Sequence, residues 1–489
     1  MSVKNGRGFV LLLSFVLASG STIGVDAPVG RQPRTAVDVR PNIVYVVMDD
    51  MHPRHLNYMT DSLRRLRDLQ DFSFLLYPNA YVTTPQCCPS RASTLRGQYA
   101  HNTGIIHNRA FPEGGNNGGA VPFRTLGLDQ STLATMLHDG GYATSMVGKY
   151  LNGYIREDPP EYIPPGWDDW HVISDTSDGA YGYSLSEDGE IVKYGYEPED
   201  YLNDVLAQRA ADAVRDADPA KPLFLFFSPY APHVPSIPAP RHAGLYPTLR
   251  VPRNPAYLET DVTGKPAWIQ ELEVTEEDID AYDLIYRNGA RTLRAVDESI
   301  QAVVDALDAT GRLDTTFFIF HNDNGAQFLE HRWAEKRVPY SASTQVFFAV
   351  ASKDPKLIQR TGMRRQLIAT NIDIGPTIAH LTGTTPDHVM DGVSIMPTFQ
   401  SRTQAVRTDL LNEYFAFTDP PPPSRIVPSW SSVVTTVPGH WKYVEWATGE
   451  RELYQLRENR FELENVVSAP ENAELVLQLA ERLQQLRNQ

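Results

Sequence analysis

Four oxygen-bearing side chains occur as two adjacent pairs that are far apart in the sequence. Asp49 and Asp50 end the stretch "NIVYVVMDD", and Asp323 and Asn324 lie in "TTFFIFHNDNG". Neighbouring carboxylates repel each other unless a cation lies between them, and carboxylate and amide oxygens are the ligands that hard divalent ions prefer. Each pair alone also fits a turn or a helix cap. Two such pairs after apolar runs predict a site for Ca²⁺ or Mg²⁺.

The only two cysteines, Cys87 and Cys88, are adjacent in the stretch "TTPQCCPSRAS". A disulfide between sequence neighbours is strained and closes no useful loop, and no second Cys or His pair nearby completes a zinc cage. Pro89 followed by "SRAS" predicts the start of a helix, whose N-terminus attracts anions, and Arg91 adds a positive charge. A chemical role is favoured over the alternative of an inert buried thiol at a turn-to-helix junction.

Three further basic residues follow apolar runs or lie in loops. Lys149 follows "TSMVG", His233 lies in the Pro-rich loop after "PLFLFF", and Lys336 lies in "AEKRVPY". Each also fits an ordinary surface or loop position. Because ligands of parallel sheets bind at the carboxyl ends of the strands, residues that follow strands are expected to meet at that edge.

The elements that must position these residues alternate between strands and helices. The stretch "STLATMLHDGG", with a Ser cap and a closing Gly pair, and the apolar face of residues 283–309 predict helices. Four short runs of β-branched and aromatic residues predict strands covered on both faces, at residues 42–48, 144–148, 222–227 and 315–320. This alternation predicts an α/β fold with a mainly parallel sheet flanked by helices.

The N-terminus indicates the compartment. A basic start, an apolar core at residues 9–18 and the small residues of "VDA" predict a signal peptide over residues 1–27, with a short membrane anchor as the alternative. The protein is therefore expected to be secreted, extracellular or periplasmic, without stable membrane insertion. The formal net charge of −16 argues against nucleic acid or anionic lipid as the main partner.

The length and composition predict two folded parts. We expect a catalytic α/β domain over residues 40–390 and a smaller C-terminal α+β subdomain over residues 391–489. In the subdomain, "HWKYVEW" and "RELYQL" predict a small antiparallel sheet, and residues 470–487 predict a closing amphipathic helix. Substrate choice is expected to reside in loops, at residues 108–125, 153–200 and the Pro-rich 419–428.

The stretch "CCPSRAS" matches the Cys-x-Pro-Ser-Arg signature of type I sulfatases. The segments "GKYLNGY", "APHVP", "NDNG", "NIDIGPT" and "DGVSIMP" follow in the order of that family, and the likeness covers nearly all of residues 41–470. The chain thus resembles the formylglycine-dependent sulfatases. The resemblance implies an alkaline-phosphatase-like fold for the large domain.

The resemblance also implies a modified residue and a ligand set. In this family a formylglycine-generating enzyme oxidises the first cysteine of the signature, here Cys87, during export. The resemblance implies that the modified Cys87 binds a divalent cation, usually Ca²⁺ with Mg²⁺ as the alternative, together with Asp49, Asp50, Asp323 and Asn324. The variable position is filled by Cys88, which explains why the two thiols are adjacent.

A mechanism follows from the same resemblance. The hydrated aldehyde at position 87 is a gem-diol, of which one hydroxyl attacks the sulfur of a sulfate ester and the other later expels sulfate. Arg91 holds the diol, while Lys149, His233 and Lys336 surround the sulfate, offset its charge and assist departure of the alcohol.

One departure separates the chain from many relatives and suggests a branch. Leu151 stands where many sulfatases have a histidine, and "GKYLN" together with "CCPSRAS" resembles the branch of N-acetylglucosamine-6-sulfatases and heparan endosulfatases. The branch makes Asn152 a candidate contact to sugar or sulfate. His331 matches a histidine found in many relatives and is a second candidate for substrate binding.

Three functions fit the sequence. The first is a sulfatase that acts on sulfated carbohydrate, such as N-acetylglucosamine 6-sulfate. The second is a phosphonate or phosphate ester hydrolase of the same superfamily. The third is an inactive relative that binds a metal or a glycan, which the retention of Cys87, Arg91 and the four metal ligands argues against.

Overall fold

The computed structural model describes residues 40–59, 61, 63, 66, 72–109, 117–154, 161–176, 179–416 and 426–489. The predicted signal peptide (1–27) and most of the predicted loop 419–428 lie outside the described residues. Parts of the predicted loops 108–125 and 153–200 lie outside them as well.

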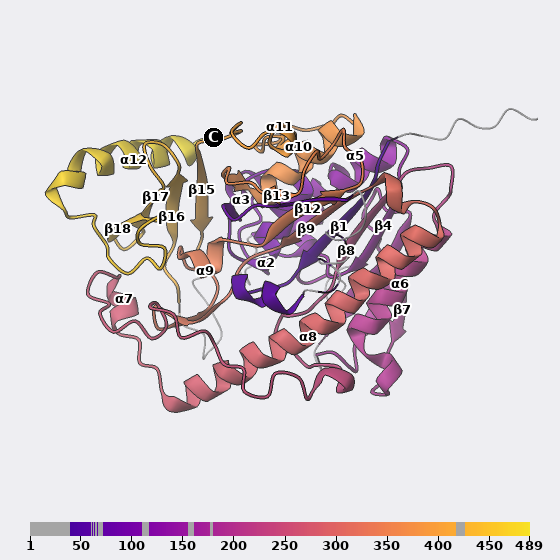
Figure 1. Cartoon of the computed structure of the whole chain (residues 1–489), viewed down its shortest axis with the longest axis horizontal. Helices are drawn as coiled ribbons and strands as arrows, with labels where there is room; N and C mark the ends of the chain where they lie inside the picture. Colours follow the sequence, from indigo (N-terminus) through magenta and orange to yellow (C-terminus); the bar gives the residue numbers. More distant parts are fainter. Residues whose placement is uncertain are drawn as a thin grey trace, which may run out of the picture. The chain divides into compact units, whose positions relative to one another are not determined.

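A ten-stranded sheet forms the core of the large domain (Figure 1), with the strand order β13-β2-β12-β9-β1-β8-β4-β5-β6-β7. The middle strands β9, β1, β8, β4 and β5 run parallel, and the strands outside them pair mainly antiparallel. The bounds are β1 (Asn42–Met48), β2 (Ser73–Leu76), β4 (Ala143–Gly148), β5 (Asp169–Asp175), β6 (Ser184–Glu187), β7 (Glu190–Lys193), β8 (Leu223–Ser228), β9 (Thr316–Asn322), β12 (Phe348–Ser352) and β13 (Gly362–Met363).

The four predicted strands are confirmed as β1, β4, β8 and β9, and the α/β fold class with them. Every residue of β1, β8 and β9 is buried, which explains their unbroken apolar sequences. The prediction that residues 153–200 are a loop was wrong, because β5, β6 and β7 lie there. Buried and partly buried positions alternate at the start of β5, β6 has two buried residues in its middle, and β7 is mostly exposed, as expected at the edge of a sheet.

Helices cover both faces of this sheet (Figure 1). One face packs against α2 (Cys87–Arg96), α5 (Leu133–Asp139), α10 (Thr370–Thr382) and α11 (Met396–Gln400). The opposite face packs against α6 (Leu202–Asp216) and α8 (Glu276–Ala309). Shorter helices are α3 (Ala100–Thr103), α4 (Ala120–Thr125), α7 (Ala267–Gln270) and α9 (Ser341–Thr344).

The predicted helices exist, with different starts. The α8 helix begins at Glu276, seven residues before the predicted 283, because Thr275 caps it and forms a capping box with Asp278. The α5 helix is capped by Thr132 rather than Ser131, since the Thr132 hydroxyl accepts hydrogen bonds from two backbone N–H groups of the first turn. Helix α4 occupies part of the predicted loop 108–125.

A separate four-stranded antiparallel sheet forms the C-terminal subdomain. Its strands are β15 (Asp409–Tyr414), β16 (Trp430–Thr435), β17 (Trp441–Trp446) and β18 (Arg451–Gln455), and α12 (Ala473–Leu486) packs on them. This confirms the predicted antiparallel sheet and closing helix. Ile395 and Phe399 pack with the large sheet, and the domain boundary at residue 391 stays a prediction.

Two small sheets complete the described part: β10 (Gln327–Glu330) with β11 (Trp333–Glu335), and β3 (Ala80–Tyr81) with β14 (Ile368–Ala369). Among the described helices, none combines the length and the apolar character that a membrane span requires.

Candidate active site

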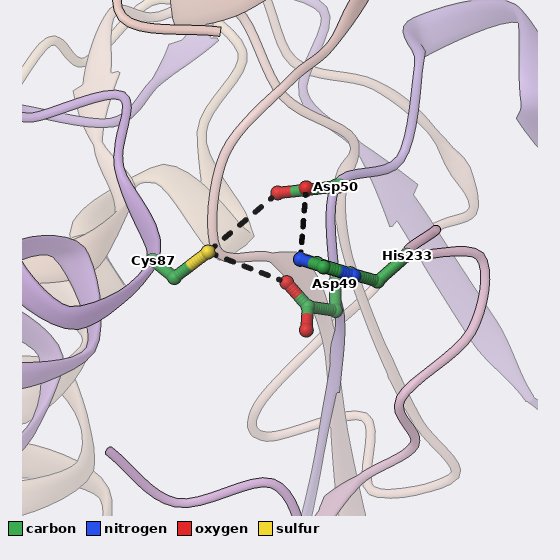
Figure 2. Close-up of side chains that lie close together, drawn as sticks. All are labelled: Asp49, Asp50, Cys87 and His233. Atoms are coloured by element: carbon green, nitrogen blue, oxygen red, sulfur yellow. Dashed lines mark hydrogen bonds and ion pairs between the residues drawn. The ribbon is translucent and has the colours of Figure 1, made fainter. Parts of the chain in front are cut away.

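The predicted chemistry converges at the carboxyl edge of the parallel strands. Asp49 and Asp50 follow β1, and Cys87 begins α2, which lies against that edge. In Figure 2 the side chains of Asp49, Asp50, Cys87 and His233 point toward one another. One ligand atom from each of the four lies within 4.8 Å of the others. Segments almost 200 residues apart in sequence therefore build one site.

The Cys87 sulfur is the centre of this arrangement. The Lys336 ammonium donates to Cys87 Sγ at 2.7 Å, and the sulfur lies 3.7 Å from Asp49 Oδ1 and 3.8 Å from Asp50 Oδ1. Cys87 is only 1% exposed. Burial raises the pKa of the thiol to about 12 although Lys149 and Lys336 oppose the shift, so unmodified Cys87 is a neutral thiol.

Arg91, one turn further along α2, ties the strand ends together. Its Nε donates to Asp323 Oδ2 at 2.7 Å, and Nη1 donates to the Lys149 carbonyl and to Ser228 Oγ, both at 2.8 Å. Nη2 lies 4.0 Å from Asp49 Oδ2 and has no hydrogen-bond partner among the described residues. Arg91 is therefore fixed on three sides and keeps one donor for a further partner.

Asp50 and Asn324 show how the carboxylates are brought together. Asp50 has φ of 58°, a left-handed conformation that costs a non-glycine residue about 1 kcal/mol or more. Its backbone N–H donates to Asp323 Oδ1 at 3.2 Å, and Asn324 Nδ2 donates to Asp50 Oδ1 at 2.6 Å. The buried Asn324 Oδ1 has no donor partner in the described part of the chain.

The donor set fits a hard divalent cation. Three carboxylates and the free amide oxygen of Asn324 are oxygen ligands of the kind that Ca²⁺ and Mg²⁺ take. The structure thus brings the predicted ligands Asp49, Asp50, Asp323 and Asn324 together with Cys87, and their binding of a cation stays a prediction. His233 joins them through Nε2, which lies 3.4 Å from Asp50 Oδ2.

Burial and the neighbouring charges shift the pKa values of Asp49 and Asp323 in opposite directions. Burial alone would raise the pKa of Asp49, but Lys149, His233 and Arg91 lower it well below its usual range. The pKa of Asp323 is raised to about 6, first by burial and then by the negative charge of Asp49, against the attraction of Arg91. Three carboxylates share one buried space, so their ionisation depends on the cationic side chains around them.

The two predicted lysines supply positive charge to different carboxylates. Lys149 pairs with Asp49 and Lys336 pairs with Asp50. Each lysine loses solvation on burial, yet the facing carboxylate raises its pKa, so both remain charged. With Arg91, three cationic side chains balance three carboxylates, and a bound divalent cation would leave a net positive charge that suits an anionic substrate.

His233 lies in the loop after β8 and has a fixed ring orientation. Its Nδ1 donates to the Val234 carbonyl at 2.6 Å, and its ring packs 4.8 Å from that of Tyr230. Nε2 therefore faces the carboxylate of Asp50.

The two predicted substrate contacts have different positions. Asn152 lines a cavity of about 610 Å³ that Lys149 and His233 also line. His331 is 2% exposed, bonds Glu259 Oε2 at 2.6 Å through Nδ1, and packs against Tyr340 at 4.2 Å. The structure therefore gives His331 partners outside the site, and a role for it in substrate binding stays an untested prediction.

Sequence reasoning missed three residues that support the site. Ser228 accepts from Arg91, Asn108 Oδ1 accepts from the Cys88 backbone N–H at 2.9 Å, and the Tyr230 ring lies 5.6 Å from Lys149 Nζ. Ser228 directly follows the predicted strand 222–227 and ends the observed strand β8, so its position at the sheet edge could have been predicted. The loop positions of Asn108 and Tyr230 carry no local signal.

A second cavity, of about 460 Å³, shares Asn108 and His233 with the first and is also lined by Asp50 and Lys336. The candidate site therefore adjoins two spaces, one lined by Lys149 and the other by Lys336.

Comparison with known protein families identifies the family of this chain and its enzyme class. The profile described as "Sulfatase" matches residues 41–384, and the profile described as "N-sulphoglucosamine sulphohydrolase, C-terminal" matches residues 329–489. The chain belongs to the sulfatase family. It is accordingly a sulfuric ester hydrolase, and the resemblance seen in the sequence is confirmed.

Named sulfatases are the relatives in sequence. The N-acetylglucosamine-6-sulfatase of Homo sapiens is 30% identical over 400 residues, covering 79% of this chain and 70% of that protein. The "Extracellular sulfatase SULF-1 homolog" of Drosophila melanogaster is 32% identical over 389 residues, which is 77% of this chain. The match spans only 33% of that longer relative.

Solved structures share the fold of this sulfatase family chain. A protein in complex with its substrate D-glucosamine-2-N,6-O-disulfate superposes with a TM-score of 0.75 at 21% identity, covering 92% of this chain and 98% of the other. The phosphonate monoester hydrolase of Agrobacterium radiobacter gives 0.69 at 19% identity, covering 92% and 96%. At these identities the likeness establishes the fold alone.

Proposed function

We propose that this chain is an exported sulfatase that hydrolyses sulfate esters of sugars, such as N-acetylglucosamine 6-sulfate, with formylglycine at position 87. One observation carries the proposal: Cys87 Sγ receives a hydrogen bond from Lys336 and lies beside Asp49 and Asp50 at the N-terminus of α2. Relatives named as N-acetylglucosamine-6-sulfatases support the sugar class.

Formylglycine at position 87 supplies a hydrated aldehyde, which offers one hydroxyl to attack sulfur and a second to release sulfate afterwards. The unmodified residue is a buried neutral thiol, which is a poor nucleophile. The conversion requires a formylglycine-generating enzyme as a partner during maturation.

We assign the divalent cation to Asp49, Asp50, Asp323 and Asn324. The crowded carboxylates and the unpartnered Asn324 Oδ1, within the part of the structure described, support this assignment. A Ca²⁺ or Mg²⁺ ion there supplies positive charge to the oxygens of the reacting ester.

The chain's own side chains perform the remaining tasks. Arg91, held by Asp323 and Ser228, orients the residue at position 87 and keeps Nη2 for an anionic oxygen. Lys149 and Lys336 offset the charge of the sulfate group. His233, with Nδ1 bound to a backbone carbonyl, presents Nε2 toward the departing alcohol and can hold a proton there.

The proposal that the protein is exported rests on residues 1–27, whose basic start and short apolar core are typical of a signal peptide. The relative named as an extracellular sulfatase supports the same proposal.

The test is the mass of the tryptic peptide that ends at Arg91, from protein exported by its native host. We expect a species about 18 Da lighter than the unmodified peptide, and hydrolysis of sugar sulfates by the same preparation. Two intact thiols with no hydrolysis would contradict the proposal. Faster hydrolysis of aryl phosphate or phosphonate esters than of aryl sulfates would favour the alternative ester class.

A further inference from the structure

Lys336 lies in a segment with a costly backbone conformation. Two residues with positive φ, His331 and Arg332, form the tight turn between β10 and β11, where such values are expected. Glu335 and Arg337, with φ of 77° and 80°, flank Lys336 outside that turn. A left-handed conformation is unfavourable for residues other than glycine. The chain therefore carries strain at the two residues on either side of Lys336, which set the direction of its side chain.

Two buried indoles hold the carbonyl groups of this segment. Trp333 Nε1 donates to the Lys336 carbonyl at 3.0 Å. Trp430 Nε1, from β16 of the C-terminal sheet, donates to the Arg337 carbonyl at 2.7 Å. Trp333 is 6% exposed and Trp430 is 2% exposed. The net free energy of one hydrogen bond is of the same order as the cost of one left-handed residue, so these contacts can decide which backbone conformation is populated.

The same segment contacts the chain just before Cys87. The Arg337 backbone N–H donates to the Pro85 carbonyl at 3.2 Å. The Lys336 ammonium donates to Cys87 Sγ at 2.7 Å and pairs with Asp50. A lysine side chain has many rotamers, so its ammonium keeps two such partners only where the backbone from which it extends is fixed.

The indoles near this segment form a chain whose ends and middle differ. The ring centroids are 5.2 Å apart for Trp333 and Trp268, 5.7 Å for Trp268 and Trp446, and 6.3 Å for Trp446 and Trp430. All four rings pack in the apolar core of the C-terminal sheet. The two end indoles bond the carbonyls described above, whereas the buried Nε1 atoms of Trp268 and Trp446 have no partner among the described residues. Hydrogen bonding to the Lys336 segment therefore distinguishes the end indoles from the middle ones.

We propose that Trp333 is a positioning residue of the active site: its indole N–H fixes the Lys336 carbonyl and thereby keeps the Lys336 ammonium against Cys87 and Asp50. Without this bond, an ordinary negative φ at Glu335 becomes accessible and turns the Lys336 side chain away from its partners. The inference rests on the proposed role of Lys336 in sulfate ester hydrolysis. It makes the aromatic core of the C-terminal sheet a support of the catalytic geometry.

A double-mutant cycle tests whether Trp333 acts through Lys336. On full-length protein whose conversion at Cys87 has been verified by mass, Trp333→Phe should lower kcat/KM for N-acetylglucosamine 6-sulfate about 10-fold, the effect of one lost hydrogen bond. In the Lys336→Met background, the same substitution should change kcat/KM by less than about 2-fold, because the ammonium that it positions is gone. Trp268→Phe is the matched control and should leave kcat/KM unchanged, since the Trp268 indole N–H has no partner in the described structure.

Chemical labelling gives a readout that needs no enzymatic activity. Acetic anhydride acetylates a lysine amine that has left its carboxylate partner, so the rate at Lys336 reports how often its pair with Asp50 opens. We expect Trp333→Phe to raise this rate about 10-fold, measured by the mass of the tryptic peptides. The rate at Lys149, which pairs with Asp49, should stay unchanged as the internal reference. Trp268→Phe should change neither rate.

Equal effects of Trp333→Phe in the wild-type and Lys336→Met backgrounds, with unchanged acetylation at Lys336, would overturn the assignment and leave Trp333 as a packing residue. Increased acetylation at both lysines would indicate general loosening of the fold and would likewise overturn it. Converted wild-type protein that does not hydrolyse the sugar sulfate, together with the expected acetylation, would contradict the proposed function and still support the positioning of Lys336 by Trp333.

Discussion

Two groups of buried polar and charged residues share the segment 331–340, which gives Lys336 to one group and His331 and Tyr340 to the other. We call one the catalytic cluster: Asp49, Asp50, Cys87, Arg91, Lys149, His233, Asp323, Asn324 and Lys336. The other, the C-terminal cluster, joins the large domain to the antiparallel sheet of the subdomain and consists of Glu259, Lys265, His331, Tyr340, Lys442, Glu452, Tyr454 and Glu462.

The C-terminal cluster is closed. Lys442 Nζ lies 2.5 Å from Glu462 Oε1, and Glu452 accepts hydrogen bonds from the hydroxyls of Tyr340 and Tyr454 at 3.0 and 3.1 Å. None of its buried side-chain nitrogens and oxygens is without a partner in the described structure. Such a network stabilises one arrangement of the chain and leaves no group for a ligand.

The catalytic cluster is open by contrast. Arg91 Nη2 and Asn324 Oδ1 have no partner within the described ranges, and other members of the cluster, Lys149, Asp50 and Lys336, line cavities. Burial and charge are therefore common to both clusters, whereas unsatisfied polar atoms and adjoining cavities distinguish the one that can react.

Cys87→Ala should give the largest effect, because it removes the residue that becomes the nucleophile. We expect kcat/KM for a sulfate ester to fall by about 10⁴-fold or more, with the fold retained. Cys88→Ala is the matched control, since Cys88 is an equally buried neighbour that packs in the core. Activity that survives Cys87→Ala, or is lost only in Cys88→Ala, would contradict the assignment.

Lys442→Met should give the largest loss of stability. It leaves the Glu462 carboxylate, which is 2% exposed, without its charged partner. We expect the free energy of unfolding, measured by urea denaturation, to fall by about 3–5 kcal/mol. The double variant Lys442→Met/Glu462→Gln should recover part of this loss. An unchanged urea midpoint in the single variant would show that the C-terminal cluster is not structural.

Lys336→Met should reduce activity strongly and stability only weakly, the reverse of what we expect for Lys442→Met. Lys336 pairs with Asp50, which keeps a hydrogen bond from Asn324 and is partly exposed. We expect kcat/KM to fall by about 10²–10³-fold through lost charge stabilisation of the reacting sulfate. The loss of stability should be smaller than that of Lys442→Met in the same urea assay. A variant with normal kinetics and a large stability loss would reverse the comparison.

Calcium should act on only one of the clusters. After chelation, Ca²⁺ at 100 times its Kd should stabilise the protein by about 2.7 kcal/mol and restore activity. Asp323→Asn should lose this calcium-dependent stabilisation, and Glu452→Gln should retain it, although both carboxylates are 1% exposed. Thermal unfolding with Ca²⁺ and with Mg²⁺ measures the effect and separates the two ions. Equal stabilisation of both variants would place the ion elsewhere.

Trp430→Phe should give the smallest effect. The Trp430 indole N–H donates to the carbonyl of Arg337, next to Lys336, at 2.7 Å. Its loss should cost about 1 kcal/mol of stability. Trp446→Phe is the matched control, because the Trp446 indole N–H has no partner in the described chain. If the two variants are equally stable, the Arg337 hydrogen bond contributes nothing.

Much of the fold could be predicted because its central strands are buried on both faces and read as unbroken apolar runs, as β1 and β9 do. The edge strands β6 and β7 are short and half exposed, so their sequence resembles that of loops. The start of α8 was missed although the Thr275 cap and the acidic first turn both mark it, because the exposed first turn adds nothing to the apolar face on which the prediction was based.

The sequence alone determined the family, the signature at Cys87 and the pairs Asp49–Asp50 and Asp323–Asn324, because each depends on residues that are adjacent along the chain. The tertiary structure decided which distant side chains meet. It brought Lys336 to Cys87 across 249 positions and gave His331 a partner in Glu259. It also formed a cavity beside α8, and it left His55 Nδ1 and Gln327 Oε1 without a hydrogen-bond partner among the residues that the structure describes. Side-chain partners across loops depend on packing in three dimensions, which local sequence patterns do not encode.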